Sequence, residues 1–168
     1  MTLACSSSGP APVQSQLQFS VTTSDQGSET FPCDSAASGI TTQLDASLSV
    51  FCDVSTGPNA SQTIAEITVQ GFHGPDAYAF EGSNAAFASS VQLTMNGWLW
   101  SSVPASAGIA ASSCTVTVTS PGAPQCGDAV SGTFHCDAML GSAVGGDGGY
   151  QPQKTTSIDG TFSGLDSY

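Results

Sequence analysis

Apolar and polar residues alternate along much of the chain. Between residues 13 and 23, Val13, Leu17, Phe19 and Val21 fall on one alternation that also includes Ser15, and glutamine or serine fills most of the positions between them. A period of two places the apolar side chains on one face of a β-strand and the polar ones on the other. The same alternation predicts further strands at residues 44–52, 65–71, 78–80, 114–118, 130–136 and 158–162.

The clearest turn signal is Asn96-Gly97, which stands between two apolar segments at residues 91–95 and 98–100. Asn-Gly favours a type I′ turn, in which both central residues have positive φ. The twist of this turn matches the strands that it joins. The sequence therefore predicts a β-hairpin here.

Two segments lack periodicity and are predicted as loops. Residues 24–38 carry Asp, Gly, Pro and Ser, and residues 141–153 include a glycine-rich run at 145–149 that disfavours a strand. Eight or nine short strands without a helical period predict an all-β fold, an antiparallel β-sandwich or small barrel. Residues 13–168 would form this single domain after a Ser/Gly/Pro-rich tether at residues 1–12.

The composition narrows the class of protein. The chain has 168 residues, of which only Lys154 is a lysine or arginine, against thirteen acidic residues. Long helices are excluded because their exposed surfaces are usually built from Glu, Lys, Arg and Gln. The net charge of −12 also argues against nucleic acid and against an anionic membrane surface as partners, because both are bound through Lys and Arg.

Six cysteines occur without a Cys-x-x-Cys pair, so disulfides are expected rather than zinc or redox sites. Disulfides persist in oxidising compartments such as the periplasm or the cell exterior. A register that pairs Val118 with Gly132 places Cys114 opposite Cys136, and we predict a disulfide between these two cysteines.

A second predicted disulfide joins Cys33 to Cys52, although Cys33 falls in a predicted loop. Six cysteines allow fifteen pairings. The partners of the other two cysteines, Cys5 and Cys126, depend on whether Cys5 is lipidated. If Cys5 carries a lipid, we expect the odd thiol at Cys126.

The N-terminal segment Leu3-Ala4-Cys5, followed by serines and a glycine, resembles the cleavage site of bacterial lipoproteins. In that pattern a small residue precedes a lipid-modified cysteine, but the expected Leu three residues before it is Thr2 here. The resemblance implies an exported protein whose signal peptide has been removed, and whose contact with the membrane is through lipid on Cys5. The alternative is an ordinary or disulfide-bonded tail cysteine.

A sequence repeat carries a second resemblance. Residues 130–134 read Val-Ser-Gly-Thr-Phe and residues 158–162 read Ile-Asp-Gly-Thr-Phe, so each copy could place Phe inward beside a Gly. With the Cys-Thr-Val-Thr-Val strand at 114–118 and the turn at 71–80, residues 64–164 resemble a loose group of uncharacterised bacterial surface lipoproteins. Asp76 replaces a glycine of their turn. The resemblance implies an exported β-sandwich and no known chemistry.

Trp98 and Trp100 follow the predicted turn two residues apart, so they share one face of their strand. If that face is the core, both indoles are buried and anchor the fold. If Leu99 points inward instead, the pair forms an exposed aromatic platform for sugar rings, with Tyr78 as a third member.

Other chemistry has less support. Residues 160–164 place Phe162 where a serine-hydrolase elbow needs Ser. A glycosidase needs only two carboxylates, and Asp76 and Glu81 are the candidates. His135 and Cys136 are adjacent on a strand and point to opposite faces, which does not fit a copper site. The sequence predicts no metal and no cofactor.

Three classes of function follow. The favoured one is a non-catalytic protein of the bacterial surface, exterior or periplasm, with a structural, adhesive or assembly role. The alternatives are a carbohydrate-binding or other ligand-binding module and a secreted glycosidase-like enzyme. The expected partners are other copies of the chain or a surface glycan.

Assembly could use the first strand. Its inward residues are Val13, Leu17, Phe19 and Val21, and such a strand can be lent to the open sheet edge of the next subunit. The alternative is ordinary pairing within the chain. Electron microscopy of native material distinguishes the two.

Overall fold

The computed structural model describes residues 17–24, 27–34, 38–43, 46–54, 62–106, 108–119, 129–143 and 153–166. These residues form eleven strands and no helix: β1 Leu17–Thr23, β2 Gly27–Cys33, β3 Gly39–Gln43, β4 Ala46–Val54, β5 Gln62–Phe72, β6 Ala77–Glu81, β7 Ser90–Met95, β8 Trp98–Ser101, β9 Ser113–Val118, β10 Ala129–Ala143 and β11 Gln153–Leu165. The predicted all-β class is confirmed.

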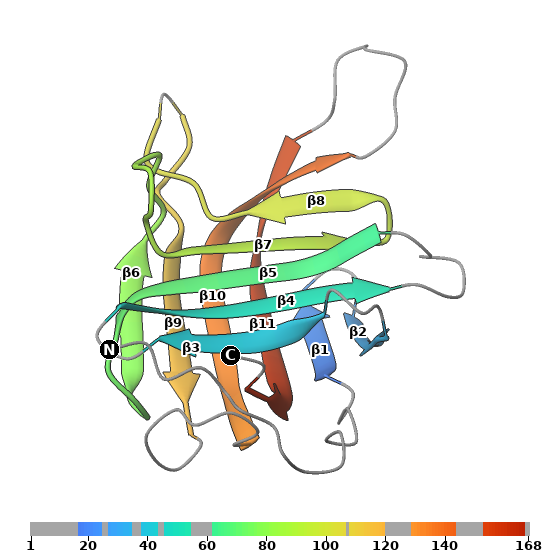
Figure 1. Ribbon diagram of the computed structural model, residues 1–168. Helices are drawn as coiled ribbons and strands as arrows, with labels where there is room; N and C mark the ends of the chain where they lie inside the picture. The colour runs from blue at the N-terminus through green and yellow to red at the C-terminus, as the bar shows by residue number, and fades with distance from the viewer. Residues whose placement is uncertain are drawn as a thin grey trace, which may run out of the picture.

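The strands form two layers that cross at a steep angle (Figure 1). One layer has the order β6-β9-β10-β11-β1-β2, and the other has the order β8-β7-β5-β4-β3. Every pairing between these strands is antiparallel. In such orthogonal packings, corners are made by strands that pass from one sheet to the other.

β10 forms the corner. Its first part pairs with β9, and its last residues pair with β8. Between them the ladder with β11 slips between Cys136 and Met139, and Ala138 has a φ of 54°. A bulge of this kind bends a strand and increases its twist. The bend lets one continuous strand belong to both layers.

The open ends of the sheet approach each other and nearly close a barrel. Ile40 of β3 forms a parallel bridge with Asp166, just after β11. The buried Asp166 carboxylate also accepts hydrogen bonds from the backbone N–H and the hydroxyl of Thr42. A disulfide joins Cys33 of β2 to Cys52 of β4. Both layers are therefore tied together along this seam.

The core lies between the layers and is built from alternate residues of nearly every strand. The repeated Gly-Thr-Phe segments pack reciprocally, because Gly132 lies opposite Phe162 and Phe134 lies opposite Gly160. A Cβ at either glycine would collide with the facing phenylalanine ring. The predicted placement of each Phe beside a Gly is confirmed.

The predicted hairpin and both predicted disulfides are confirmed. Asn96 and Gly97 have φ values of 49° and 75°, as a type I′ turn requires. Val118 pairs with Gly132 in the expected register. The Cys114–Cys136 disulfide is present in addition to the one at the seam.

Other predictions were wrong. Residues 24–38 contain β2, which pairs with β1 along its whole length, so Cys33 lies in a strand and not in a loop. β2 was missed for two reasons. Its first half is polar, and it contains Pro32, a residue that sheets tolerate mainly in edge strands such as this one. β3 was missed too, so the described residues form eleven strands rather than the eight or nine predicted.

The loop predicted at residues 141–153 begins too early. β10 continues to Ala143, and Gly141 pairs with Trp100. Glycine is required there because a Cβ would overlap the Trp100 ring. Its presence reflects close packing and not chain flexibility.

The first strand pairs within the chain on both sides, with β11 and with β2. Leu17, Phe19 and Val21 are buried in the core, whereas Val13 lies outside the described residues, as do the tether at 1–12, Cys5 and Cys126. The structure thus contains the ordinary pairing. Strand exchange between subunits stays a prediction.

Candidate binding face

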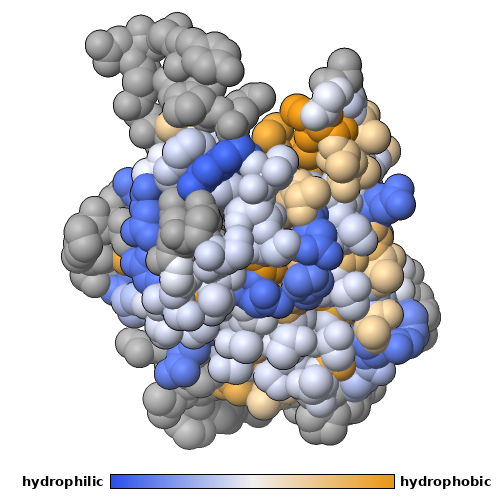
Figure 2. All heavy atoms as spheres, turned by 180° about the vertical axis from the view of Figure 1, so that it is seen from behind, coloured by the Kyte–Doolittle hydropathy of each residue, from blue (hydrophilic) through white to orange (hydrophobic). Residues whose placement is uncertain are grey.

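The outward side of the layer formed by β9, β10, β11, β1 and β2 is covered with hydroxyl groups. Because the strands pair in register, one hydroxyl from each of the five strands falls on a single line across the sheet. This line, called the hydroxyl row below, consists of Thr117, Thr133, Thr161, Ser20 and Thr30. Figure 2, which views the molecule from behind, is largely pale blue across its centre, as expected of Ser and Thr.

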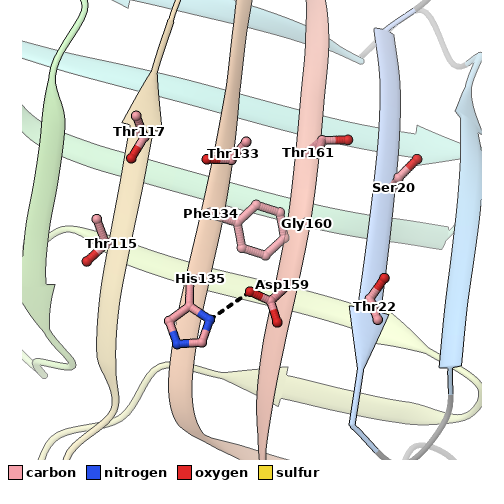
Figure 3. A pocket seen from close by; sticks show the side chains of 10 residues that line it. All are labelled: Ser20, Thr22, Thr115, Thr117, Thr133, Phe134, His135, Asp159, Gly160 and Thr161. Atoms are coloured by element: carbon pink, nitrogen blue, oxygen red, sulfur yellow. Dashed lines mark hydrogen bonds and ion pairs between the residues drawn. The ribbon is translucent and has the colours of Figure 1, made fainter.

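A hollow of about 370 Å³ lies on this face. Figure 3 shows the threonine and serine side chains around it, coming from β9, β10, β11 and β1. Phe134 and Gly160 line the hollow between these hydroxyl-bearing positions. The hydroxyl groups are thus grouped around a shallow depression, which can receive a ligand with many hydroxyl groups of its own.

The hydroxyl groups differ in what they bind. Ser20 and Thr30 are 2.9 Å apart and hydrogen-bonded to each other, which occupies part of their capacity. By contrast, Thr117, Thr133 and Thr161 make no side-chain hydrogen bond with any residue that the structure describes. Within the hydroxyl row, the members on β9, β10 and β11 are therefore the ones available to a ligand.

A charged cluster borders the row. His135 Nδ1 lies 2.7 Å from Asp159 Oδ1, and His135 Nε2 lies 3.2 Å from Asp137 Oδ2. The Ser157 hydroxyl donates to Asp137. Since Ser157 bonds to a carboxylate and not to His135, the cluster lacks the serine–histidine contact that activates a nucleophile.

The cluster shifts two pKa values. The hydrogen bond to Asp159 is the main cause that raises the pKa of His135 above its ordinary value, and the hydrogen bond to Asp137 adds to it. The pKa of Asp137 is lowered mainly by the hydrogen bond from Ser157, and to a smaller extent by the one from His135. A protonated His135 can donate to both carboxylates at once, whereas a neutral one can donate to only one.

These shifts predict a pH-dependent contribution to stability. Because the folded-state pKa of His135 is raised, its contribution is complete below the unfolded-state pKa and is lost as the pH rises through the folded-state pKa. His135→Asn should therefore destabilise the protein more at about pH 5.5 than at about pH 9. Urea unfolding at the two pH values measures this. An equal or larger loss at the higher pH would contradict the account.

The tryptophans lie elsewhere, on β8. Trp100 is fully buried, with 0% exposure, while Trp98 is half-buried and stacks on it at a ring distance of 5.8 Å. The ammonium group of Lys154 lies 4.4 Å from the Trp98 ring centre and 5.0 Å from that of Trp100. The predicted burial in the core is confirmed for Trp100 and holds in part for Trp98.

The structure does not bring Tyr78 to the tryptophans. Tyr78 is buried on β6, packs against Phe72 and donates its hydroxyl to the Gly74 carbonyl. β6 and β8 belong to different layers. The three aromatic side chains therefore do not form one platform for a sugar.

The candidate carboxylate pair is also separated. Asp76 and Glu81 stand at opposite ends of β6, which at ~3.3 Å per residue places them roughly 16 Å apart along the strand. Glycosidase carboxylates lie within about 9.5 Å of each other. Asp76 instead accepts a hydrogen bond from the Ala77 N–H and lies 3.0 Å from His73.

His135 is exposed and Cys136 is buried in a disulfide, on opposite faces of β10 as predicted. In the described part of the chain, no three His, Cys, Asp or Glu side chains are placed to hold a metal ion. Nor do those residues contain a helix long and apolar enough to cross a membrane.

Comparison with protein-family models, curated proteins and solved structures gives no match.

The hydroxyl face could not be located from the sequence. The alternating threonines of residues 115–119 mark one hydroxyl-bearing strand. However, Ser20 and Thr117 fall on one line only because β10 and β11 pair between their strands in the right register. That alignment depends on pairing between distant segments, for which a single sequence gives no signal.

Proposed function

We propose that the protein is a non-catalytic, exported adhesive protein that holds a neutral, hydroxyl-rich polymer, such as a polysaccharide, against the face that carries the hydroxyl row. The observation that carries this proposal is the alignment of hydroxyl groups from five neighbouring strands, four of which contribute to the lining of a hollow. Hydroxyl groups both donate and accept hydrogen bonds, as do those of a sugar.

Charge supports a neutral ligand. The net charge of −12 repels anionic polymers. Close to the hollow, the charged groups are His135, Asp137 and Asp159, which are hydrogen-bonded to one another. Two disulfides among the described residues agree with an oxidising compartment and thus with export.

Adhesion requires only weak binding at each molecule. A single hydrogen bond exchanged with water contributes about 0.5–1.5 kcal/mol, so a few threonines give a modest affinity. Many copies on one surface, bound to one polymer, gain avidity because each later contact forms at a high effective concentration. A shallow hydroxyl face suits this mode of binding.

Co-sedimentation with an insoluble neutral polysaccharide tests the proposal. The full chain should sediment with cellulose or chitin, and retention should fall when Thr133→Val and Thr161→Val are combined. Valine keeps the shape and the β-propensity while removing the hydroxyl. The control is Thr41→Val, an exposed threonine on β3 of the other layer, which should be retained like the wild type. Absence of retention, or equal retention of the double variant, would refute the proposal.

A second candidate is binding through Trp98, whose half-exposed indole stacks on Trp100 beneath Lys154. Aromatic rings stack on sugars, so this surface could hold a glycan without the threonines. Trp98→Ala separates the two candidates: retention should survive if the hydroxyl face binds the polymer, and should disappear if the tryptophan does.

A further inference from the structure

We infer that the ligand is an extended, unbranched polysaccharide that crosses the strands along the hydroxyl row, with its main contacts at Thr117, Thr133 and Thr161. This inference rests on the proposed function and specifies the shape of the ligand and its direction on the sheet. It follows from three features of the face: which hydroxyl groups are uncommitted, how they are spaced, and where the row ends.

The uncommitted hydroxyl groups define the centre of the site. Thr117, Thr133 and Thr161 lie on three adjacent strands and have no side-chain hydrogen bond to the described residues. At the other end, Ser20 and Thr30 already bond to each other. A ligand therefore gains most of its hydrogen-bond energy from the row's threonines on β9, β10 and β11, and less from the members on β1 and β2.

The direction follows from what surrounds these threonines. Along β10, the next outward residue after Thr133 is His135, and along β11 the neighbour of Thr161 on one side is Asp159; these two are hydrogen-bonded to each other. In this direction, a polymer that ran along either strand would leave the hydroxyl groups and meet this ionic pair. In the other direction it would meet Ser131, whose hydroxyl is already hydrogen-bonded to Thr119. Across the strands, every position of the row is a hydroxyl.

The spacing selects an extended chain. Neighbouring strands lie ~4.8 Å apart, so hydroxyl groups recur along the row at about the length of one sugar unit in a ribbon-like polysaccharide. A helical polysaccharide turns successive units away from a straight line and would lose the register. Cellulose-type and chitin-type chains fit this requirement.

The row has a defined end. On β6, the residue opposite Thr117 is the exposed Ala77, whose methyl group makes no hydrogen bond. At the opposite end, Thr30 lies on β2, a terminal strand of the sheet. The site therefore has a limited length, set by the five strands that carry the row.

Calorimetric titration with soluble cello-oligosaccharides of increasing length tests the inference. Affinity should rise by about tenfold or more from the monosaccharide to the trisaccharide, and should level off by about five units, when the ligand spans the row. Thr117→Val should weaken binding of the trisaccharide about two- to tenfold, as for the loss of one hydrogen bond. Thr115→Val removes a hydroxyl that also borders the hollow but lies outside the row, and it should weaken binding clearly less than Thr117→Val. The matched control is Thr41→Val, an exposed threonine on β3 of the other layer, which should bind like the wild type.

The outcomes distinguish a failure of the inferred ligand direction from a failure of the proposed polysaccharide-binding function. If the protein binds polysaccharides but affinity is independent of length, or if helical malto-oligosaccharides bind as well as cello-oligosaccharides, the orientation is wrong and adhesion stands. If Thr115→Val weakens binding as much as Thr117→Val, the ligand does not follow the row. If no saccharide of any length binds and nothing is retained on insoluble polysaccharide, the proposed function fails as well.

Discussion

Replacing Trp100 by alanine should lower the free energy of unfolding by about 3–5 kcal/mol, as for other large aromatic side chains removed from a core. Trp100 is fully buried, lies opposite Leu93 in the β7–β8 hairpin and covers Gly141 on the neighbouring strand. Its ring therefore fills space where the hairpin meets the bent end of β10. Truncation leaves a cavity that these rigid strands cannot close.

Trp98→Ala is the matched control, because Trp98 stacks on the same ring but is half-exposed. Trp98→Ala should lower the free energy of unfolding clearly less than Trp100→Ala does. Trp100→Phe should also cost less than alanine, since it keeps a ring and removes an indole N–H that has no hydrogen-bond partner among the described residues. Urea unfolding measures all three variants. A loss for Trp98→Ala equal to that for Trp100→Ala would contradict the assignment of Trp100 as the anchor.

Removal of the Cys33–Cys52 disulfide should be the other large effect. The two cysteines are 19 residues apart, and closing a loop of about that length restricts the unfolded chain by about 3 kcal/mol. The disulfide also joins β2 to β4 across the seam between the layers. The double variant Cys33→Ser/Cys52→Ser should therefore lose about 3 kcal/mol, with its unfolding midpoint in urea lowered accordingly.

The Cys114–Cys136 pair provides the comparison, because its separation of 22 residues is similar but it joins the neighbouring strands β9 and β10. Chain entropy alone predicts nearly equal losses for the two pairs. A larger loss at Cys33–Cys52 would assign extra stabilisation to the seam. An unfolding curve unchanged by the Cys33→Ser/Cys52→Ser variant would contradict a role of the disulfide in holding the layers together.

The sequence predicted those parts of the fold that local chemistry determines. Asn96-Gly97 defined its hairpin because few residue pairs accept positive φ at both positions. Cys114 and Cys136 followed from alternation and a single register between neighbouring strands. β2 could not be predicted in the same way, because its first residues lack alternation and it is stabilised by pairing with β1.

The candidate site was much less predictable than the fold. His135 was recognised as an outward residue of its strand, yet its partner Asp159 comes from β11 and is brought to it by pairing of distant segments. The same holds for the hydroxyl row, whose members are spread from Ser20 to Thr161. Trp98 and Trp100 were prominent in the sequence, but one is buried in the core and the other is stacked on it.

Nuclear magnetic resonance titration of the isotope-labelled full chain with a soluble cello-oligosaccharide reports which residues the ligand touches, and so tests whether the hydroxyl face binds the polymer. We expect the backbone signals of Thr117, Thr133 and Thr161 to move together and saturate together, while those of β3 and β4 on the other layer stay in place. Movement confined to the indole signals of Trp98 and Trp100, with the threonines unchanged, would contradict it.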